Sequence, residues 1–134
     1  LSLINRNRGS GTRILMDFYL SKIAASKGIK LEELTREIQG YSSEAKSHSA
    51  VAAAVAHGRA DAGVGIRTVG VQYGLDFAKI ADESFDFLLA KDGLVKPALQ
   101  SFLAALRSKE FASSLTAKAP GLKPSPSTGT VLVS

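Results

Sequence analysis

Apolar positions in the first half of this chain follow two patterns. Short continuous runs are typical of buried strands, and spacings of three or four residues are typical of helices that face a core. Glycines follow several of the helical segments, where a residue in the left-handed conformation commonly ends a helix. The predicted elements are a strand at Leu1–Ile4, a helix at Gly11–Ser26 that stops at Gly28, a shorter helix from Leu31 to near Gly40, a helix at Ala50–Ala56 that closes at Gly58, and a strand at Asp61–Ile66.

The second half of the chain predicts more elements of both kinds and then a polar tail. Pro97 indicates the start of an amphipathic helix, because proline is favoured at the first helical position. The predicted elements are a short helix capped by Thr68 that ends at Gly74, strands at Phe77–Ile80 and Phe85–Ala90, the helix from Pro97 through Leu106, a second short helix that holds Phe111 and Leu115, and at Val131–Val133 either an edge strand or a disordered end.

Alternation of strands with helices is typical of an α/β fold with a mainly parallel sheet. We therefore expect an α/β domain over residues 1–118, followed by a tail rich in proline, serine and glycine at residues 119–134. In such a fold, ligands bind beyond the carboxyl ends of the strands, where helices begin. The loops Arg6–Arg13 and Tyr41–Ser49 each precede a predicted helix, so we expect them to face one cleft.

Composition narrows the class of protein. With 134 residues, 45% of them hydrophobic, the chain is long enough to bury a core. Its net charge of +5 comes with lysines scattered along predicted helices, without the basic and aromatic platform that favours nucleic acid. It contains no cysteine, which excludes disulfides and cysteine-ligated metals, and no segment approaches the roughly 18 apolar residues of a membrane span. Because Leu1 already lies in a predicted strand and no initiator methionine precedes it, we expect a piece of a longer polypeptide.

The loop before the first helix carries the strongest chemical signal, Asn5-Arg6-Asn7-Arg8-Gly9-Ser10-Gly11-Thr12-Arg13. The first turn of a helix leaves backbone amides unpaired and carries partial positive charge, so it attracts anions. The glycines allow close backbone approach, Ser10 and Thr12 add hydroxyl donors, and the arginines add full charge. The loop predicts a site for an oxyanion, a phosphate or a carboxylate. The alternative is an ordinary helix cap by Ser10 or Thr12 with solvated arginines.

Three better-known glycine-rich motifs are excluded for this loop. It lacks the Gly-Lys-Ser/Thr end of a Walker A nucleotide loop. It also lacks the third glycine and distal acidic residue of a dinucleotide fingerprint. Because glycines flank Ser10 directly, it is not the Gly-x-Ser-x-Gly turn of a hydrolase nucleophile.

The second polar loop repeats this chemistry. Ser47, His48 and Ser49 stand at the predicted start of the alanine- and valine-rich helix, with hydroxyls and an imidazole that can donate to an anion. The helix dipole favours a neutral imidazole there, so His48 is expected to contribute a hydrogen bond rather than charge. The alternative is that Ser47 caps the helix and His48 is solvated. Arg67, just after a predicted strand, is a further ligand candidate.

Other polar residues are expected to have less specific roles. We expect a structural role for His57 at a helix end, a loop-tying role for Asp61, and solvation of Glu44, whose alternatives are pairs with Arg13 or Arg67.

A catalytic or metal site is not favoured. Two histidines without cysteine make a poor zinc site. A hydrolytic triad of Ser10, His48 and Asp61 is geometrically conceivable, but Ser, His and Asp occur in any protein of this size.

Several segments occur in an order that matches a known family. They are Ile4–Arg13, Gly40-Tyr41 with Glu44 and Ser47-His48, Ala50–Ala56, Gly58–Gly63 and Gly65–Arg67, followed by Gly74–Phe77 and Glu83–Asp86. Together they resemble the periplasmic-binding-protein-like domain attached to molybdopterin-biosynthesis (molybdotransferase-type) proteins or to helix-turn-helix regulators. More distantly, the chain is similar to molybdate- and tungstate-binding receptors, which use a similar Ser-Gly-Thr helix start.

This resemblance implies a type II binding-protein fold, a three-layer sandwich in which ligand lies between two lobes. Because the chain begins at the crossing strand, it implies an incomplete two-lobe unit. Taking residues and resemblance together, the candidate ligand-binding residues are Arg8, Ser10, Gly11, Thr12, Arg13, Ser47, His48 and Arg67.

We therefore expect a cytoplasmic, non-enzymatic domain without cofactor that binds a small anion. Molybdate or tungstate is favoured, with an anionic pterin-type ligand as a further option, and the link to molybdenum-cofactor metabolism rests on the resemblance. The alternatives are a regulatory or protein-interaction module without ligand and an enzyme acting on an anionic substrate. We expect no membrane partner, nucleic acid contact only through a fused helix-turn-helix domain, and either a homodimer or a larger parent chain.

Overall fold

The computed structural model describes residues 1–132. The chain divides at Phe77 into two compact units. The first unit, residues 1–77, contains every candidate ligand-binding residue. The boundary predicted after residue 118 separates a folded domain from a tail, which is not the division between these two units, so it stays a prediction.

A small parallel sheet forms the centre of the first unit. Its strands are β1 (Leu3–Arg6), β2 (Glu44–Ala45) and β3 (Ala62–Gly63), in the order β2-β1-β3. Both pairings are parallel, with Asn5 opposite Glu44 and Leu3 opposite Ala62. The predicted α/β class with a parallel sheet is confirmed for this unit.

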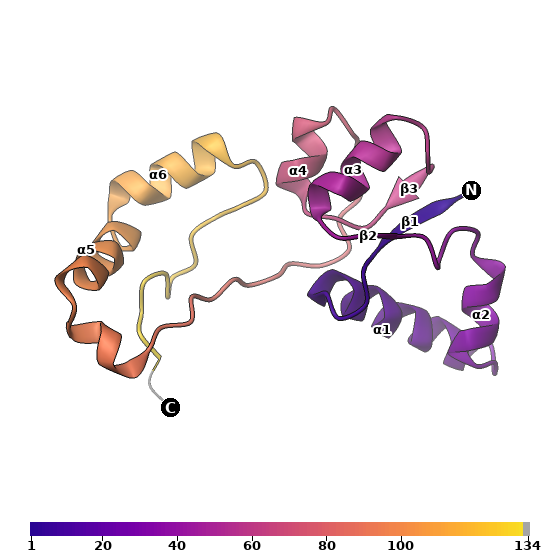
Figure 1. Ribbon diagram of the computed structural model, residues 1–134, viewed down its shortest axis with the longest axis horizontal. Helices are drawn as coiled ribbons and strands as arrows, with labels where there is room; N and C mark the ends of the chain where they lie inside the picture. The colour runs from indigo at the N-terminus through magenta and orange to yellow at the C-terminus, as the bar shows by residue number, and fades with distance from the viewer. Residues whose placement is uncertain (133–134) are drawn as a thin grey trace. The chain divides into compact units, whose positions relative to one another are not determined.

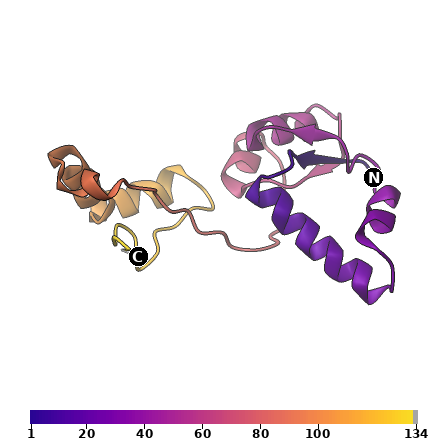
Figure 2. The same ribbon diagram turned by 60° about the horizontal axis from the view of Figure 1, so that its bottom comes forward.

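Helices cover both faces of this sheet. Figures 1 and 2 show α1 (Gly11–Ser26) and α2 (Leu31–Glu37) on one side, and α3 (His48–Ala56) and α4 (Arg67–Gln72) on the other. The predicted bounds of α1 are confirmed, because Ser10 caps its start and Gly28, at φ +69°, follows its end in the left-handed conformation.

Small side chains bring the first unit's helices close to its sheet. Most of its buried apolar residues are alanines, together with Val51 of α3 and Leu34 of α2. A Cβ on Gly63 of β3 would lie 2.4 Å from Val51 Cγ1, so the close approach of α3 requires glycine there. Two buried residues are polar: Asn5 is 0% exposed and Arg13 is 3% exposed.

Over its described residues, the regular elements of the second unit are helices, joined and flanked by irregular segments. It contains a 3₁₀ helix, η1 (Lys91–Val95), then α5 (Pro97–Leu106) and α6 (Lys109–Lys118). Leu103 and Leu106 of α5 are buried. The start of α5 at Pro97 and the presence of a second short helix are confirmed.

Several predicted elements differ from the structure. The predicted strands Phe77–Ile80 and Phe85–Ala90 are wrong, since both segments lie outside any strand and Leu88 is 99% exposed. Their β-forming side chains are present, but a strand also requires a partner for its backbone, and none pairs with them in the described residues. Of the predicted terminal strand, Val131 and Leu132 lie outside any strand, and Val133 lies outside the described residues.

Smaller differences concern the first unit. The strand predicted at Leu1–Ile4 lies two residues further along, at Leu3–Arg6. Thr68 is not a helix cap, because α4 begins one residue earlier with Ile66 at its N-cap position. The predicted strand Asp61–Ile66 shrinks to Ala62–Gly63. β2 was not predicted, since it lies inside the polar stretch that carries no apolar pattern. Its two residues form a strand because their backbone pairs with β1.

Candidate functional site

The carboxyl ends of the three parallel strands lie at one edge of the sheet, and a helix begins shortly after each. α1 follows β1, α3 follows β2, and α4 follows β3. Arg6 Nη2 donates to the Lys46 carbonyl at 3.3 Å, so the first two loops are neighbours. A Cβ built on Gly65 would lie 3.7 Å from His48 Nδ1, so the third loop lies beside the start of α3. The two predicted ligand loops therefore share one edge.

Ser10 shapes the N-terminus of α1. Its Oγ accepts a hydrogen bond from the Arg13 amide at 3.2 Å, which is the ordinary capping role named as the alternative. Amides in the first turn of a helix have no intrahelical carbonyl to bind, so capping by Ser10 leaves those of Gly11 and Thr12 for water or a ligand. The cap and an anion site are therefore compatible at this helix.

Ser47 has the same function at α3. Its Oγ accepts from the Ala50 amide at 3.0 Å, and the side chain is exposed. His48, the first residue of α3, is half-buried beside Gly65. Two capped helix N-termini thus lie at the carboxyl edge, on loops joined by the Arg6–Lys46 hydrogen bond.

Arg13 lies inside the unit with its charge already compensated. Its Nε lies 3.0 Å from both carboxylate oxygens of Asp17, and its Nη1 lies 3.2 Å from Glu44 Oε1. The same Nη1 also donates to the Arg6 carbonyl at 3.3 Å. The guanidinium therefore joins α1, the end of β1 and β2, and direct contact between Arg13 and a ligand stays a prediction.

Tyr41 completes a cluster with Arg13, Asp17 and Glu44. Its ring centroid lies 4.3 Å from Arg13 Cζ, and its hydroxyl donates to Asp17 Oδ1 at 2.8 Å. Burial on its own lowers the pKa of Arg13, but the side-chain hydrogen bonds with Tyr41 and Asp17 outweigh burial and raise that pKa. Burial, with the hydrogen bond to Asp17, raises the pKa of the Tyr41 hydroxyl. Arg13 thus favours its charged form, and Tyr41 favours the neutral form that donates to Asp17.

Glu44 is not simply solvated, contrary to the expectation. Its Oε1 accepts from Arg13 and lies 3.9 Å from Arg8 Nε. The alternative pair with Arg13 is correct. Arg8, by contrast, is 88% exposed at its side chain, which makes it the arginine of this loop with the greatest access to solvent and solutes.

The remaining candidates lie apart from this cluster or have structural roles. Arg67 is exposed at the first residue of α4, and His57 follows the last residue of α3. Asp61 accepts from both the amide and the hydroxyl of Ser2, at 2.6 and 3.0 Å, which confirms its loop-tying role.

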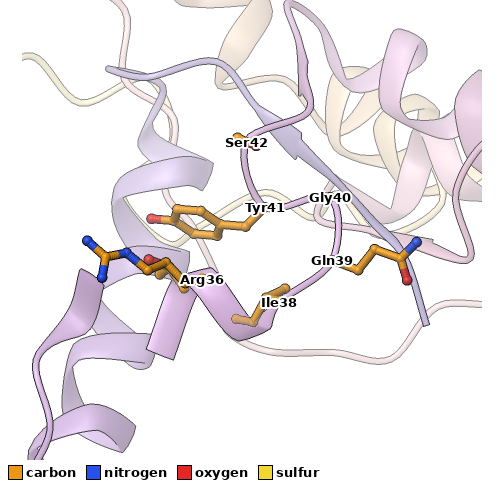
Figure 3. A pocket seen from close by; sticks show the side chains of 7 residues that line it. Arg36, Ile38, Gln39, Gly40, Tyr41 and Ser42 are labelled. Carbon is orange, nitrogen blue, oxygen red and sulfur yellow. The ribbon is translucent and has the colours of Figure 1, made fainter. Parts of the chain in front are cut away.

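Two hollows adjoin Tyr41. The Arg8 hollow, of about 260 Å³, is lined by Arg8, Arg13, Asp17, Leu31, Glu32, Thr35 and Tyr41. The Arg36 hollow, of about 360 Å³, is lined by Thr35, Arg36, Ile38, Gln39, Gly40, Tyr41 and Ser42. Figure 3 shows the Arg36 hollow, with the Gln39 side chain extending away from that of Tyr41. The Arg8 hollow brings together two predicted arginines, whereas Ser47 and His48 line neither hollow.

Sequence reasoning missed two members of the cluster, Asp17 and Tyr41. The spacing of Arg13 and Asp17 was a usable signal, because oppositely charged residues four apart face each other on a helix. Tyr41 carried no such signal, since its contact with Arg13 depends on the return of the chain after α2.

In residues 1–132, the histidine, aspartate and glutamate side chains do not come together in threes as a metal site requires. Within the same residues, each helix is too short or too polar to cross a bilayer.

Comparison with known proteins identifies one family. Residues 1–107 match the sequence model of the family described as "PBP superfamily domain". The chain is 28% identical over 116 residues to the "Uncharacterized protein YvgK" of Bacillus subtilis (strain 168), a match that covers 87% of this chain and 34% of that protein. It is 35% identical over 75 residues to the "Uncharacterized protein in ferredoxin 2Fe-2S gene 5'region" of Clostridium pasteurianum, covering 55% of this chain and 66% of that protein. The chain thus spans about a third of the first relative and just under two thirds of the second. No solved structure matches.

Proposed function

We propose that this chain, which belongs to the PBP superfamily, binds a small anion at the carboxyl edge of its parallel sheet. Membership in this superfamily indicates ligand binding in general. The finer assignment, an anion held at the N-termini of α1 and α3, is our proposal. We assign the chain a binding role rather than a catalytic one.

The observation that carries this proposal is the pairing of two capped helix N-termini on adjacent loops. Ser10 and Ser47 each satisfy one amide of their helix, and the Arg6–Lys46 hydrogen bond holds the loops together. Helix N-termini offer amide donors and partial positive charge to an anion. Arg8 adds an exposed guanidinium on the first of these loops.

The favoured anion is molybdate or tungstate, and this choice rests on the sequence resemblance. An anionic pterin-type ligand is the second choice. Relatives named above are described only as uncharacterised, so the link to molybdenum-cofactor metabolism, the cytoplasmic location and any fused partner stay predictions.

A thermal-shift titration tests this proposal. Molybdate, tungstate, sulfate and phosphate are compared at matched ionic strength, because a ligand that binds the native state raises its melting temperature. We expect a saturable rise, larger for molybdate and tungstate, that is reduced in Thr12→Val. No rise with any of these anions would contradict the proposal.

The second unit supplies a control for capping. Ser108 caps α6 with its Oγ 3.0 Å from the Phe111 amide, much as Ser10 caps α1. Loss of either cap costs about 1 kcal/mol of stability. Ser10→Ala is expected to weaken the anion response, and Ser108→Ala to leave its dependence on anion concentration unchanged.

One observation favours the alternative of a protein-interaction module. α1 exposes four large apolar side chains, Ile14, Phe18, Tyr19 and Ile23. Sedimentation of the chain with and without molybdate separates the two functions. Concentration-dependent association without any anion response supports the module, and an anion response in a monomer supports the binding role.

A further inference from the structure

We infer that Glu44 determines how strongly the proposed site attracts anions, by neutralising the two arginines that flank the start of α1. This inference rests on the proposed function. It concerns the strength and salt dependence of anion binding, which the helix N-termini alone do not determine.

The charges around Arg13 cancel. Glu44 Oε1 lies 3.2 Å from Arg13 Nη1 and 3.9 Å from Arg8 Nε, so one carboxylate oxygen faces both arginines. Asp17 supplies a second carboxylate, 3.0 Å from Arg13 Nε. The ion pairs thus join two cations, Arg8 and Arg13, to two carboxylates, and the formal charges of these four residues sum to zero.

The two arginines differ in how firmly Glu44 holds them. Arg13 is 4% exposed at its side chain and has Asp17, Tyr41 and the Arg6 carbonyl as further partners. Arg8 is 88% exposed and lies at the outer limit of an ion pair. Exposed pairs of this kind contribute little energy, so an arriving anion can take Arg8 from Glu44 at small cost.

The consequence is a competition for Arg8. With Glu44 charged, an anion is held mainly by amide and hydroxyl donors, and Arg8 is shared between the anion and Glu44. With Glu44 uncharged, Arg8 is released and the cluster carries a net positive charge. Anion binding then becomes tighter and more sensitive to salt, because it gains a Coulombic part.

The experiment compares Glu44→Gln, Arg8→Gln and the double variant with the wild-type chain, with molybdate and sulfate as probes. Affinity is measured by calorimetry at low and high ionic strength. The matched control is Glu37→Gln, which removes a carboxylate from an exposed position at the end of α2.

We expect Glu44→Gln to bind anion about fivefold more tightly at low salt, the effect of one unit charge at roughly 4 Å in water. High salt should remove most of this gain. The double variant loses one cation and one carboxylate, so it should bind about as tightly as the wild type. Glu37→Gln should bind as the wild type does. Unchanged or weaker binding by Glu44→Gln, or a double variant that binds as tightly as Glu44→Gln, overturns the inference.

Two further outcomes are informative. If Glu44→Gln does not fold, as judged by circular dichroism, the salt dependence of anion binding by the wild-type chain tests the inference instead. Binding that changes by less than about twofold between low and high salt supports a neutral cluster, and a steep loss overturns it. If the wild-type chain binds neither anion, the proposed function and this inference both fail, whereas wild-type binding without the Glu44 effect overturns the inference alone.

Discussion

Arg13 Nη1 lies 3.2 Å from Glu44 Oε1, a contact that joins the first helix to a strand 31 residues further along the chain. The same guanidinium binds Asp17 within its own helix and the carbonyl of Arg6. One buried cation thus fixes the loop that precedes α1 with respect to β2.

Asp17→Asn is expected to destabilise the first unit, because Arg13 would lose a charged partner while staying buried. Removing one partner of a fully buried pair costs about 3–5 kcal/mol. Asp17 is 32% exposed at its side chain, so we expect a smaller loss, about 2–3 kcal/mol.

Tyrosine fluorescence during urea denaturation measures this loss selectively. The chain has three tyrosines, Tyr19, Tyr41 and Tyr73, and all lie in the first unit. Asp76→Asn, at an exposed position just after α4, is the control and should cost little. Equal losses in the two variants would contradict the role given to Asp17.

Tyr41 is expected to ionise at higher pH than an ordinary tyrosine. Burial and the hydrogen bond to Asp17 raise its pKa in the folded chain above the ordinary value of about 10. Because the folded pKa exceeds the unfolded one, the associated stabilisation is complete below pH of about 10 and is lost as pH rises through the folded pKa.

Absorbance of tyrosinate during an alkaline titration measures this pKa. We expect a late step in the wild-type chain that Tyr41→Phe removes. A late step that survives in Tyr41→Phe would show the assignment to be wrong.

Asp61 is expected to remain ionised to unusually low pH. Hydrogen bonds from the Ser2 amide and hydroxyl lower its pKa, so its stabilising effect is present at neutral pH and is lost as pH falls through that lowered value. Ser2→Ala removes the hydroxyl bond and should raise the pKa part of the way. Carboxyl chemical shifts of Asp61 in an acid titration measure it, and an unchanged pKa in Ser2→Ala would exclude the hydroxyl as a cause.

Gly40→Ala is expected to be far more damaging than Gly28→Ala. Both glycines have positive φ, +81° and +69°, so either substitution incurs the left-handed penalty of about 1–2 kcal/mol. A Cβ on Gly40 would also lie 2.1 Å from the Leu3 carbonyl oxygen, whereas one on Gly28 meets nothing within 4 Å.

The free energy of unfolding, followed by tyrosine fluorescence, separates the two effects. Only Gly40→Ala must move the backbone of Leu3 at the start of β1, so its loss should clearly exceed that of Gly28→Ala. Equal losses would mean that β1 yields easily and does not anchor the turn after α2.

Local sequence signals predicted the helices of this chain well. A capping serine and a closing glycine gave the bounds of α1, because both act within one turn of the helix end. Strands were harder to predict, because a strand also depends on a distant partner. Phe85–Ala90 has the composition of a strand but no partner in the described residues, and β2 has a partner but no apolar pattern.

The candidate site was predictable in the same limited sense. The capping roles of Ser10 and Ser47 depend on residues three positions away, so sequence indicated them. The surroundings of Arg13 depend on three segments that only the fold brings together. Sequence alone therefore suggested an arginine facing a ligand where the structure has one paired with two carboxylates.

The central claim, that a small anion binds at the starts of α1 and α3, is tested most directly by an amide-resolved NMR titration with molybdate. We predict saturable shifts concentrated in the backbone amides of Gly11, Thr12 and Ser49, with sulfate acting more weakly at the same positions. Shifts centred elsewhere, or none that saturate, would contradict the claim.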